Sequence, residues 1–388
     1  MLDVLILGAG ISGLSTAWKL KLENPAIKLK VLERTNRVGG SIYSLKSSSG
    51  QLYEMGPRSF RDEPKMRALL SSLSLDDQII TASKETHRRY LLLNDRCVSL
   101  FSLGGWFFFK ALYRDIFCSK GAVEDESVYE FFSKRYGEEF ASLFADSLVT
   151  GVYAADSKTL SMQCAFPALW KSGSLFKSFW KNRLQLLTLK SGLSTLPEAL
   201  YERLKNEVQL ETDVGEITDV GRVETSRGLL QARKVISTLP RPDLLPYTNV
   251  TIVSCGFDKP NLLPQGFGML VPTVSHKELL GVVFDSSVFP QQTTSMPSRC
   301  TFMFGGARCP SFSANSDEEI MQKVESALAR YFNVQEPVAE FNIWRADGAI
   351  PAFPVGFAQV REWMQKDQVI THSGSWMSGV ALADCISI

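Results

Sequence analysis

The first forty residues contain the feature that most constrains the fold. The apolar run Leu2–Leu7 is followed at once by Gly8-Ala9-Gly10-Ile11-Ser12-Gly13, and residues 14–20 then have helical spacing. A GxGxxG segment between a buried strand and a helix is typical of a dinucleotide-binding βαβ unit. In such a unit the first glycine makes the turn, the second admits a pyrophosphate, and the third lets helix and strand pack closely.

The second strand and its continuation indicate which dinucleotide is bound. Residues 29–32 read as a strand ending on Glu33, whose carboxylate is placed to accept hydrogen bonds from an adenosine ribose. The basic residues and glycine pair that follow have no particular use in an NAD domain. They resemble the ER..R.GG run that wraps the FAD diphosphate in two-domain flavoproteins, whereas an ordinary turn with a solvated arginine is the alternative. The run consists of Glu33, Arg34, Arg37, Gly39 and Gly40, with Ser41 next to it.

Composition narrows the class of protein. At 388 residues the chain is long for one hydrophobic core, so two or three lobes are expected. Its 42 basic and 41 acidic residues give a net charge of +1, and no nucleic-acid surface is expected. Seven scattered cysteines without a CxxC pair, together with three dispersed histidines, argue against a metal site or a disulfide framework.

The N-terminal segment and the apolar segments of the chain indicate where the protein is located. The first strand begins almost at residue 1, so no signal or transit peptide is expected, and a cytoplasmic protein is predicted. No run of eighteen apolar residues exists, so no helix is expected to span a bilayer. The aromatic residues 106–109, closed by Lys110, suit peripheral contact with one leaflet, on the cytoplasmic face of an inner membrane. A buried core helix is the equally weighted alternative.

Three further segments are candidates for flavin contacts. Gly56-Pro57-Arg58-Ser59 is a sharp turn, and in flavin oxidases such a loop lies against the isoalloxazine ring, although a plain structural turn is the alternative. Val214, at the end of an expected strand over residues 208–214, is placed to offer a backbone amide to the adenine. Gly379-Val380-Ala381-Leu382 is expected to open a helix whose N-terminus meets the O2–N1 edge of the flavin.

These patterns predict an α/β (α+β) fold: a Rossmann-like FAD-binding domain with an inserted antiparallel-sheet substrate domain and a helical lobe. Residues 86–181 read as mostly helical and include a helix over 128–136 that is capped by Asp125-Glu126-Ser127. The predicted FAD-binding domain comprises residues 1–58, 186–245 and 365–388. Residues 86–185 form the helical domain with the substrate mouth and any membrane contact, and residues 59–85 and 246–364 form the substrate-binding domain.

Longer stretches resemble the oxygen-dependent protoporphyrinogen oxidases over nearly the whole chain and in the same order. They comprise residues 147–167, 266–290, 302–308 and 379–386. The resemblance implies removal of six electrons from protoporphyrinogen IX in three flavin cycles, each reoxidised by O2 to hydrogen peroxide. It therefore implies a tetrapyrrole substrate, and no catalytic side chain is nominated because flavin N5 accepts the hydride. A homodimer is among the expected assemblies.

The same resemblance supplies candidate substrate residues. Arg89 matches the arginine that this family places against a propionate, with Arg88 as the second candidate. The resemblance implies that the tetrapyrrole ring lies between Phe267 and Leu270 on one side and the small residues Gly151 and Ala154 on the other.

Alternatives and departures remain at this level. Coproporphyrinogen III oxidation uses the same flavin chemistry, and an amine oxidase, a carotenoid desaturase or a non-catalytic prenyl-protein escort is more distant. Members of the family continue past Ile386 with a helix packed on the FAD domain, whereas this sequence ends at Ile388, so stability or FAD retention is expected to suffer. Phe357 stands where members often carry a histidine.

Overall fold

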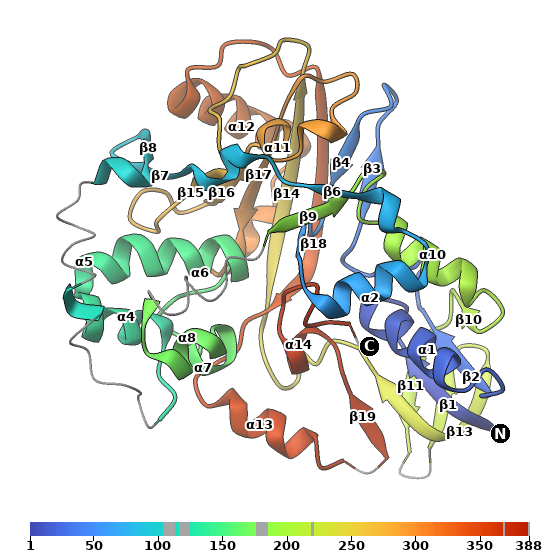
Figure 1. Ribbon diagram of the computed structural model, residues 1–388. Coiled ribbons are helices and arrows are strands. Elements are labelled where there is room, and N and C mark those ends of the chain that lie inside the picture. The colour runs from blue at the N-terminus through green and yellow to red at the C-terminus, as the bar shows by residue number, and fades with distance from the viewer. Residues whose placement is uncertain (104–112, 116–123, 176–184, 219–220, 368, 387–388) are drawn as a thin grey trace.

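The computed structural model describes residues 1–388 except 104–112, 116–123, 176–184, 219–220, 368 and 387–388 (Figure 1). Two seven-stranded sheets and a group of helices build the molecule. The predicted α/β fold class is confirmed. The aromatic residues 106–109 lie outside the described residues, so their interfacial role stays a prediction.

The first sheet is a parallel sheet with an antiparallel extension. Its order is β10-β2-β1-β13-β12-β11, and β19 pairs in parallel with the end of β13. Leu5, Ile6 and Leu7 are fully buried because both faces of the sheet are covered, as is usual for parallel strands. The elements are β1 (Leu2–Leu7), α1 (Ile11–Glu23), β2 (Leu29–Leu32), β10 (Val208–Gln209), β11 (Val214–Ile217), β12 (Arg222–Thr225), β13 (Gly228–Ser237) and β19 (Ile370–His372).

The second sheet is antiparallel except where β15 and β7 run in parallel, and its order is β18-β14-β17-β16-β15-β7-β8. Helix α12 (Asp317–Phe332) packs on it, and Ser316 with Glu319 forms a capping box at its start. The strands are β7 (Arg89–Leu93), β8 (Arg96–Ser99), β14 (Tyr247–Phe257), β15 (Gly268–Leu270), β16 (Leu279–Val283), β17 (Ser298–Gly305) and β18 (Glu340–Pro351).

The helical part lies beside the second sheet, across the molecule from the first sheet (Figure 1). The predicted helix over 128–136 is present, and Ser127 caps it with Glu130. Its core is aromatic, with Phe131, Phe132 and Phe353 fully buried. The helices are α4 (Val128–Tyr136), α5 (Glu138–Phe140), α6 (Asp146–Tyr153), α7 (Met162–Ala165), α8 (Pro167–Ser172) and α13 (Phe357–Met364), with a π turn at Ala141–Ala145.

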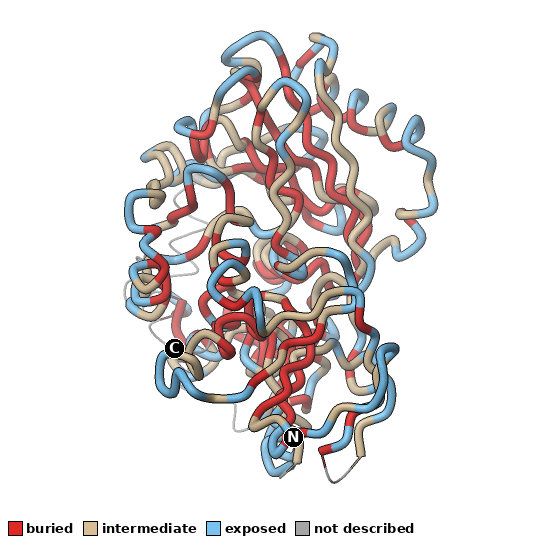
Figure 2. Tube along the Cα trace, turned by 90° about the vertical axis from the view of Figure 1, so that its right-hand side faces the viewer, coloured by how far each residue is buried: buried red, intermediate tan, exposed pale blue. Residues whose placement is uncertain are grey.

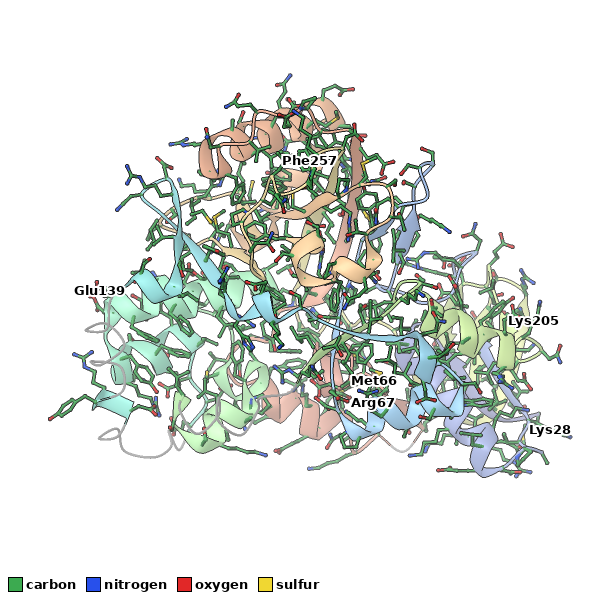
Figure 3. All side chains as sticks on the ribbon, turned by 45° about the horizontal axis from the view of Figure 1, so that its top comes forward. Lys28, Met66, Arg67, Glu139, Lys205 and Phe257 are labelled. Carbon is green, nitrogen blue, oxygen red and sulfur yellow. The ribbon has the colours of Figure 1, made fainter. Side chains whose placement is uncertain are left out.

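Smaller elements connect these parts. Buried side chains are concentrated in the two sheets and under the helices (Figure 2), and Phe257, Met66 and Glu139 mark the second sheet, α2 and the helical part (Figure 3). The elements are β3 (Ser44–Lys46), β4 (Leu52–Glu54), β5 (Phe60–Arg61), α2 (Pro64–Ser72), β6 (Ile79–Thr81), β9 (Leu186–Leu189), α10 (Thr195–Arg203), α11 (Asp285–Val288) and α14 (Ser375–Ser378). Single 3₁₀ turns occur at Asp76–Gln78, Lys84–His87, Leu100–Leu103, Pro290–Gln292, Gly306–Arg308 and Pro310–Ala314.

Two segments lie elsewhere than the predicted division of the chain would put them. Residues 89–99 form β7 and β8 of the second sheet rather than helices. Residues 60–81 pack on the first sheet, because β5 and β6 pair with β9 and because Met66 and Leu69 join the core under α1. The three-domain division itself stays a prediction. No helix in the described part of the chain is long and apolar enough to cross a membrane.

Candidate active site

Two glycine turns meet at the carboxyl end of β1. Gly10 and Gly39 form a parallel bridge, in which the Gly39 N–H donates to the Ala9 carbonyl at 2.9 Å. A Cβ on Gly40 would lie 3.3 Å from the Cα of Gly10, and one on Gly13 would lie 2.0 Å from the Gly8 carbonyl oxygen. The absent side chains therefore let helix α1, its turn and the second glycine pair approach one another.

The start of α1 fits an anionic group. The first N–H groups of a helix have no partner within the helix, and α1, which is described in full, begins without a capping side chain or an acidic residue in its first turn. A Cβ on Gly10 would meet no atom closer than the Gly40 Cα at 3.9 Å, so the backbone is open there. Ala9, Ile11 and Ser12 are buried around this opening. The residues present therefore fit a dinucleotide diphosphate.

Glu33 lies where the two strands and the glycine turn converge. Its Oε2 accepts a hydrogen bond from the Ala9 N–H at 3.0 Å, and its Oε1 accepts from the N–H and hydroxyl of Thr35. The Thr212 N–H donates to the Glu33 carbonyl at 2.8 Å, which brings the segment before Val214 to the same place. Val214 itself opens β11, whereas the sequence predicted that it would end a strand. The reason is a break after Gln209, where Glu211 takes a left-handed φ of 52°.

Arg37 is engaged with its own turn. Its guanidinium donates to the Gly40 carbonyl at 2.7 Å and to the Ile42 carbonyl at 3.2 Å, and it lies 5.1 Å from the centre of the Tyr43 ring. It therefore shapes the Gly39-Gly40 turn through main-chain contacts, and its predicted contact with the diphosphate stays a prediction. Arg34 is exposed beside it.

The loop at Gly56-Pro57-Arg58-Ser59 packs on the same turn. A Cβ on Gly56 would lie 2.0 Å from the Ser41 carbonyl oxygen, so only glycine fits. The Arg58 guanidinium pairs with the Asp285 carboxylate at 2.6 Å, and both side chains are less than a fifth exposed. Asp285 also accepts from the Thr301 hydroxyl at 2.7 Å. This pair joins the loop to the second sheet, and the sequence did not single out Asp285.

Glu54, just before that loop, is buried. It accepts hydrogen bonds from the Ser44 hydroxyl and the Leu193 N–H, each at 2.7 Å. Burial raises the pKa of Glu54 to about 7, although these two hydrogen bonds and nearby Arg58 oppose the shift. The sequence around Glu54 gives no indication that this carboxyl group is buried.

The substrate candidates converge on β7 and β15. The Arg89 guanidinium lies 4.9 Å from the centre of the Phe267 ring, and backbone pairing of Arg89 with Gly268 fixes this contact. Surrounding protein atoms desolvate Arg89 and lower its pKa, although its side chain stays open to solvent. No carboxylate in the described part of the chain forms an ion pair with Arg89, whereas Arg88 pairs with Glu85 at 3.0 Å.

The other three substrate candidates, Leu270 on the sheet and Gly151 and Ala154 on α6, also lie close together. A Cβ on Gly151 of α6 would lie 2.4 Å from the Cδ2 of Leu270, so helix and strand are in contact there. Ala154 is buried at the end of α6 with a left-handed φ of 50°, and its carbonyl accepts from the Ala307 N–H at 2.7 Å. The structure thus brings together residues from β7, β15 and α6 that are far apart in the sequence.

The segment Gly379-Val380-Ala381-Leu382 returns to the start of α1. Leu382 packs in the same core as Ile11. The predicted helix from Gly379 is wrong: α14 ends at Ser378, Gly379 has a φ of 125°, and turns follow as far as residue 385. No group of three potential metal-binding side chains occurs among the residues with described positions.

Comparisons with known proteins agree with this geometry. Residues 11–378 match the family described as flavin containing amine oxidoreductase. The chain therefore belongs to this family, is an FAD-dependent oxidoreductase, and takes FAD as its cofactor.

Particular relatives narrow the comparison further. Protoporphyrinogen oxidase of Bos taurus is 29% identical over 456 aligned positions, covering 99% of this chain and 96% of the relative. Protoporphyrinogen oxidase 1, chloroplastic, of Arabidopsis thaliana is 26% identical over 99% of this chain and 86% of its own length. A solved structure from Exiguobacterium sp. 255-15, provisionally described as protoporphyrinogen oxidase, superimposes with a TM-score of 0.84 at 22% identity, over 99% of this chain and 96% of that one. That likeness shows the shared fold.

Proposed function

We propose that this chain oxidises protoporphyrinogen IX to protoporphyrin IX in porphyrin and haem biosynthesis. Relatives named protoporphyrinogen oxidase match the chain along nearly its whole length. The structural observation that carries the proposal is Arg89, an arginine with no ion-pair partner among the described residues, next to apolar side chains. Arg89 stands over Phe267, and Leu270 faces Gly151 next to it. A tetrapyrrole, which is an apolar ring with propionates at its edge, fits a cation placed next to apolar side chains.

Each group of proposed substrate residues has a distinct role. Arg89 binds one propionate through two parallel hydrogen bonds, which fixes the orientation of the ring as well as its charge. We assign Phe267 and Leu270 to one face of the macrocycle and Gly151 and Ala154 to the other; because Gly151 and Leu270 are in contact in the structure, the Leu270 side chain must move aside to admit the ring. Bound FAD supplies the hydride acceptor. The protein contributes placement and exclusion of water, so no side chain is assigned to proton transfer.

The cofactor site is built from segments that the fold brings together. The start of α1 and the second glycine pair would hold the diphosphate, and Glu33 would hold the ribose. The loop at Gly56–Ser59 and the turn after Gly379 would flank the flavin ring. The proposed residues are Gly8, Ala9, Gly10, Ile11, Ser12, Gly13, Glu33, Arg34, Arg37, Gly39, Gly40, Ser41, Gly56, Pro57, Arg58, Ser59, Val214, Gly379, Val380, Ala381 and Leu382.

Anaerobic mixing tests the substrate directly. Protoporphyrinogen IX should bleach the flavin absorbance faster than coproporphyrinogen III, because the second arginine needed for extra propionates is already paired with Glu85. Readmitted O2 should restore the flavin colour and give hydrogen peroxide, since O2 is the proposed electron acceptor. Bleaching by coproporphyrinogen alone would reassign the substrate, and no bleaching by either would refute the proposal.

We further propose peripheral membrane contact through residues 106–109, on the cytoplasmic side. Aromatic residues next to a cation favour the interface between lipid headgroups and acyl chains. Replacing Trp106 and Phe108 together by serine should move the protein from sedimented liposomes into the supernatant. Equal partitioning of the variant and the parent would remove this assignment.

A further inference from the structure

The turn after Gly379 is connected to the start of α1. The Cys385 thiol donates to the Gly379 carbonyl at 3.4 Å and also contacts the Ser12 side chain, and Leu382 packs in the same core as Ile11. Because turns follow Gly379 where the sequence predicted a helix, no helix dipole supplies positive charge at this point. Any positive charge for a cofactor beside the turn has to come from side chains.

Three cations from three different elements lie close to this turn. The Asp384 carboxylate stands against Gly379, because a Cβ on Gly379 would lie 2.7 Å from the Asp384 Oδ2. Surrounding protein atoms desolvate Asp384 and raise its pKa, although it stays open to solvent. The positive charges that oppose this shift belong to Lys65 of α2, Arg61 of β5 and Arg361 of α13.

One carboxylate does not balance these three cations. Arg61, Lys65 and Arg361 form no ion pair in the part of the chain that the structure describes. The side chains around Asp384 therefore carry an excess of positive charge. Such an excess attracts a negative group to the turn.

Arg361 is half-buried and held in place. Its Nε donates to the Trp376 carbonyl at 2.9 Å, and its guanidinium lies 4.3 Å from the centre of the Phe353 ring and 5.7 Å from that of the Phe357 ring. Burial lowers the pKa of Arg361, but an arginine remains charged at neutral pH. Its Nη2 is buried without a hydrogen-bond partner among the described residues. A buried cation with a free donor is costly unless an electron-rich group approaches it.

Reduced flavin is a group of this kind. The oxidised isoalloxazine ring is neutral, whereas uptake of two electrons with one proton leaves a negative charge on its N1–O2 edge. Charge near the ring nitrogens is one of the means by which a protein tunes a flavin. Positive charge beside that edge stabilises the reduced form more than the oxidised form, and therefore raises the reduction potential.

We infer that Arg361, together with Lys65 and Arg61, takes the place of the predicted helix N-terminus and raises the reduction potential of the bound flavin. These residues act through their charge, so none of them is assigned as catalytic. The inference rests on the proposed function, because that function puts the turn after Gly379 beside the flavin ring.

Reduction potentials of the FAD-loaded variants test the inference. Each potential is measured by equilibrating the flavin with a reference dye during slow anaerobic reduction, so no porphyrinogen is needed. Arg361→Gln keeps a planar donor for the Trp376 carbonyl but removes the charge. It should lower the affinity for reduced FAD relative to oxidised FAD about tenfold, which is about 30 mV for a two-electron couple. Arg361→Lys keeps the charge, so its affinity ratio should stay within about twofold of the wild type.

The neighbouring charges give the sign of the effect. Lys65→Gln should also lower the potential, whereas Asp384→Asn should raise it, because this change removes a negative charge beside Gly379. Arg61 is exposed, so solvent screening should make the effect of Arg61→Gln the smallest. A residue that only supports the fold would change the affinity for both redox forms alike and leave the potential unaltered.

Arg345→Gln is the matched control. Arg345 also donates to backbone carbonyls, those of Ser313 and Asn315, but Asp317 neutralises it at 2.7 Å. The potential of Arg345→Gln should equal that of the wild type.

Wild-type potentials in both Arg361→Gln and Lys65→Gln, or shifts of the same sign in Lys65→Gln and Asp384→Asn, would overturn the inference. If Arg361→Gln does not retain FAD, the comparison of Lys65→Gln with Asp384→Asn decides by itself. Unchanged potentials with a raised dissociation constant for protoporphyrin IX would assign the cations to a substrate carboxylate and also overturn it. A wild-type protein that holds FAD but does not oxidise porphyrinogen refutes the proposed substrate, while the potentials still decide this inference.

Discussion

Replacing Arg89 by alanine should weaken substrate binding without affecting the cofactor. Arg89 has no ion-pair partner among the described residues, and its guanidinium lies 4.9 Å from the centre of the Phe267 ring. The propionate is remote from the carbon that loses hydride, so most of the loss should appear in the Michaelis constant. A smaller fall in turnover is expected, because a loosely held ring spends less time aligned with the flavin. Flavin content should not change, since Arg89 is distant in the fold from the glycine turns.

The magnitude follows from the exposure of Arg89. A fully exposed ion pair contributes at most about 1 kcal/mol, whereas truncating a buried pair costs about 2–5 kcal/mol. Arg89 is open to solvent in the free protein, and a ring bound next to Phe267 would partly cover it. We therefore expect about 2 kcal/mol, which corresponds to a Michaelis constant raised about 30-fold.

The chain supplies a control for this experiment in the adjacent residue. Arg88 already pairs with Glu85 at 3.0 Å, so Arg88→Ala should change the Michaelis constant less than about twofold. Arg89→Lys should recover only part of the loss, because an ammonium cannot form the two-pronged contact. Steady-state porphyrin fluorescence at fixed O2 gives both kinetic constants. Wild-type constants for Arg89→Ala, or a larger effect for Arg88→Ala, would show that the propionate binds elsewhere.

Other perturbations test the cofactor turns and the groups around the loop at Arg58. Gly10→Val should leave a folded protein without flavin, because the protein leaves space for a Cβ there but the side chain would occupy the diphosphate position. Gly13→Ala should prevent folding, because its Cβ would lie 2.0 Å from a carbonyl oxygen. Flavin absorbance and thermal melting distinguish the two variants, and full flavin content in Gly10→Val would contradict the assignment. Glu54 has a folded pKa of about 7 against an ordinary value of 4.5, so the folded state binds the extra proton and the free energy of unfolding should fall by about 3 kcal/mol as pH rises between these values. Urea titrations should show a flatter pH profile for Glu54→Gln, and an unchanged profile would mean that Glu54 does not titrate there. Asp285→Ala leaves Arg58 buried without its partner and should lower the free energy of unfolding by about 3 kcal/mol. Adding Arg58→Met to the same chain should partly restore it. Urea unfolding measures both variants, and an unchanged free energy of unfolding in Asp285→Ala would argue against the pair.

Features governed by local chemistry could be predicted from the sequence. The strand, glycine turn and helix at the N-terminus, the position of Glu33 and the capped helix over 128–136 all lie where expected. Helix α12 is likewise defined by nearby residues, because Ser316 and Glu319 form the capping box at its start. In each case, residues within one or two turns of each other determine the outcome.

Features that depend on distant partners could not be predicted. Residues 89–99 look like part of a helical region until β15, far along the chain, pairs with β7. The Arg58–Asp285 pair joins residues 227 positions apart, and no spacing in the sequence announces it. The turn after Gly379 was misread as a helix because small apolar residues suit both conformations, and packing against the start of α1 selects the turn.

The position of β19 has a consequence for the synthesis of this protein on the ribosome. β13 pairs in parallel with β1, which is made first, but its second parallel partner comes only from residues 370–372, and the segment that closes on α1 comes later still. The site for FAD therefore remains incomplete until residues 370–386 have been made, roughly 20 to 70 s after residue 1 at ordinary elongation rates. During that interval one edge of the nascent first sheet is uncovered, and chaperones that shield strand edges have their longest opportunity to act. Cofactor loading accordingly follows the synthesis of these late segments, and its yield depends on how much free FAD is present at that time.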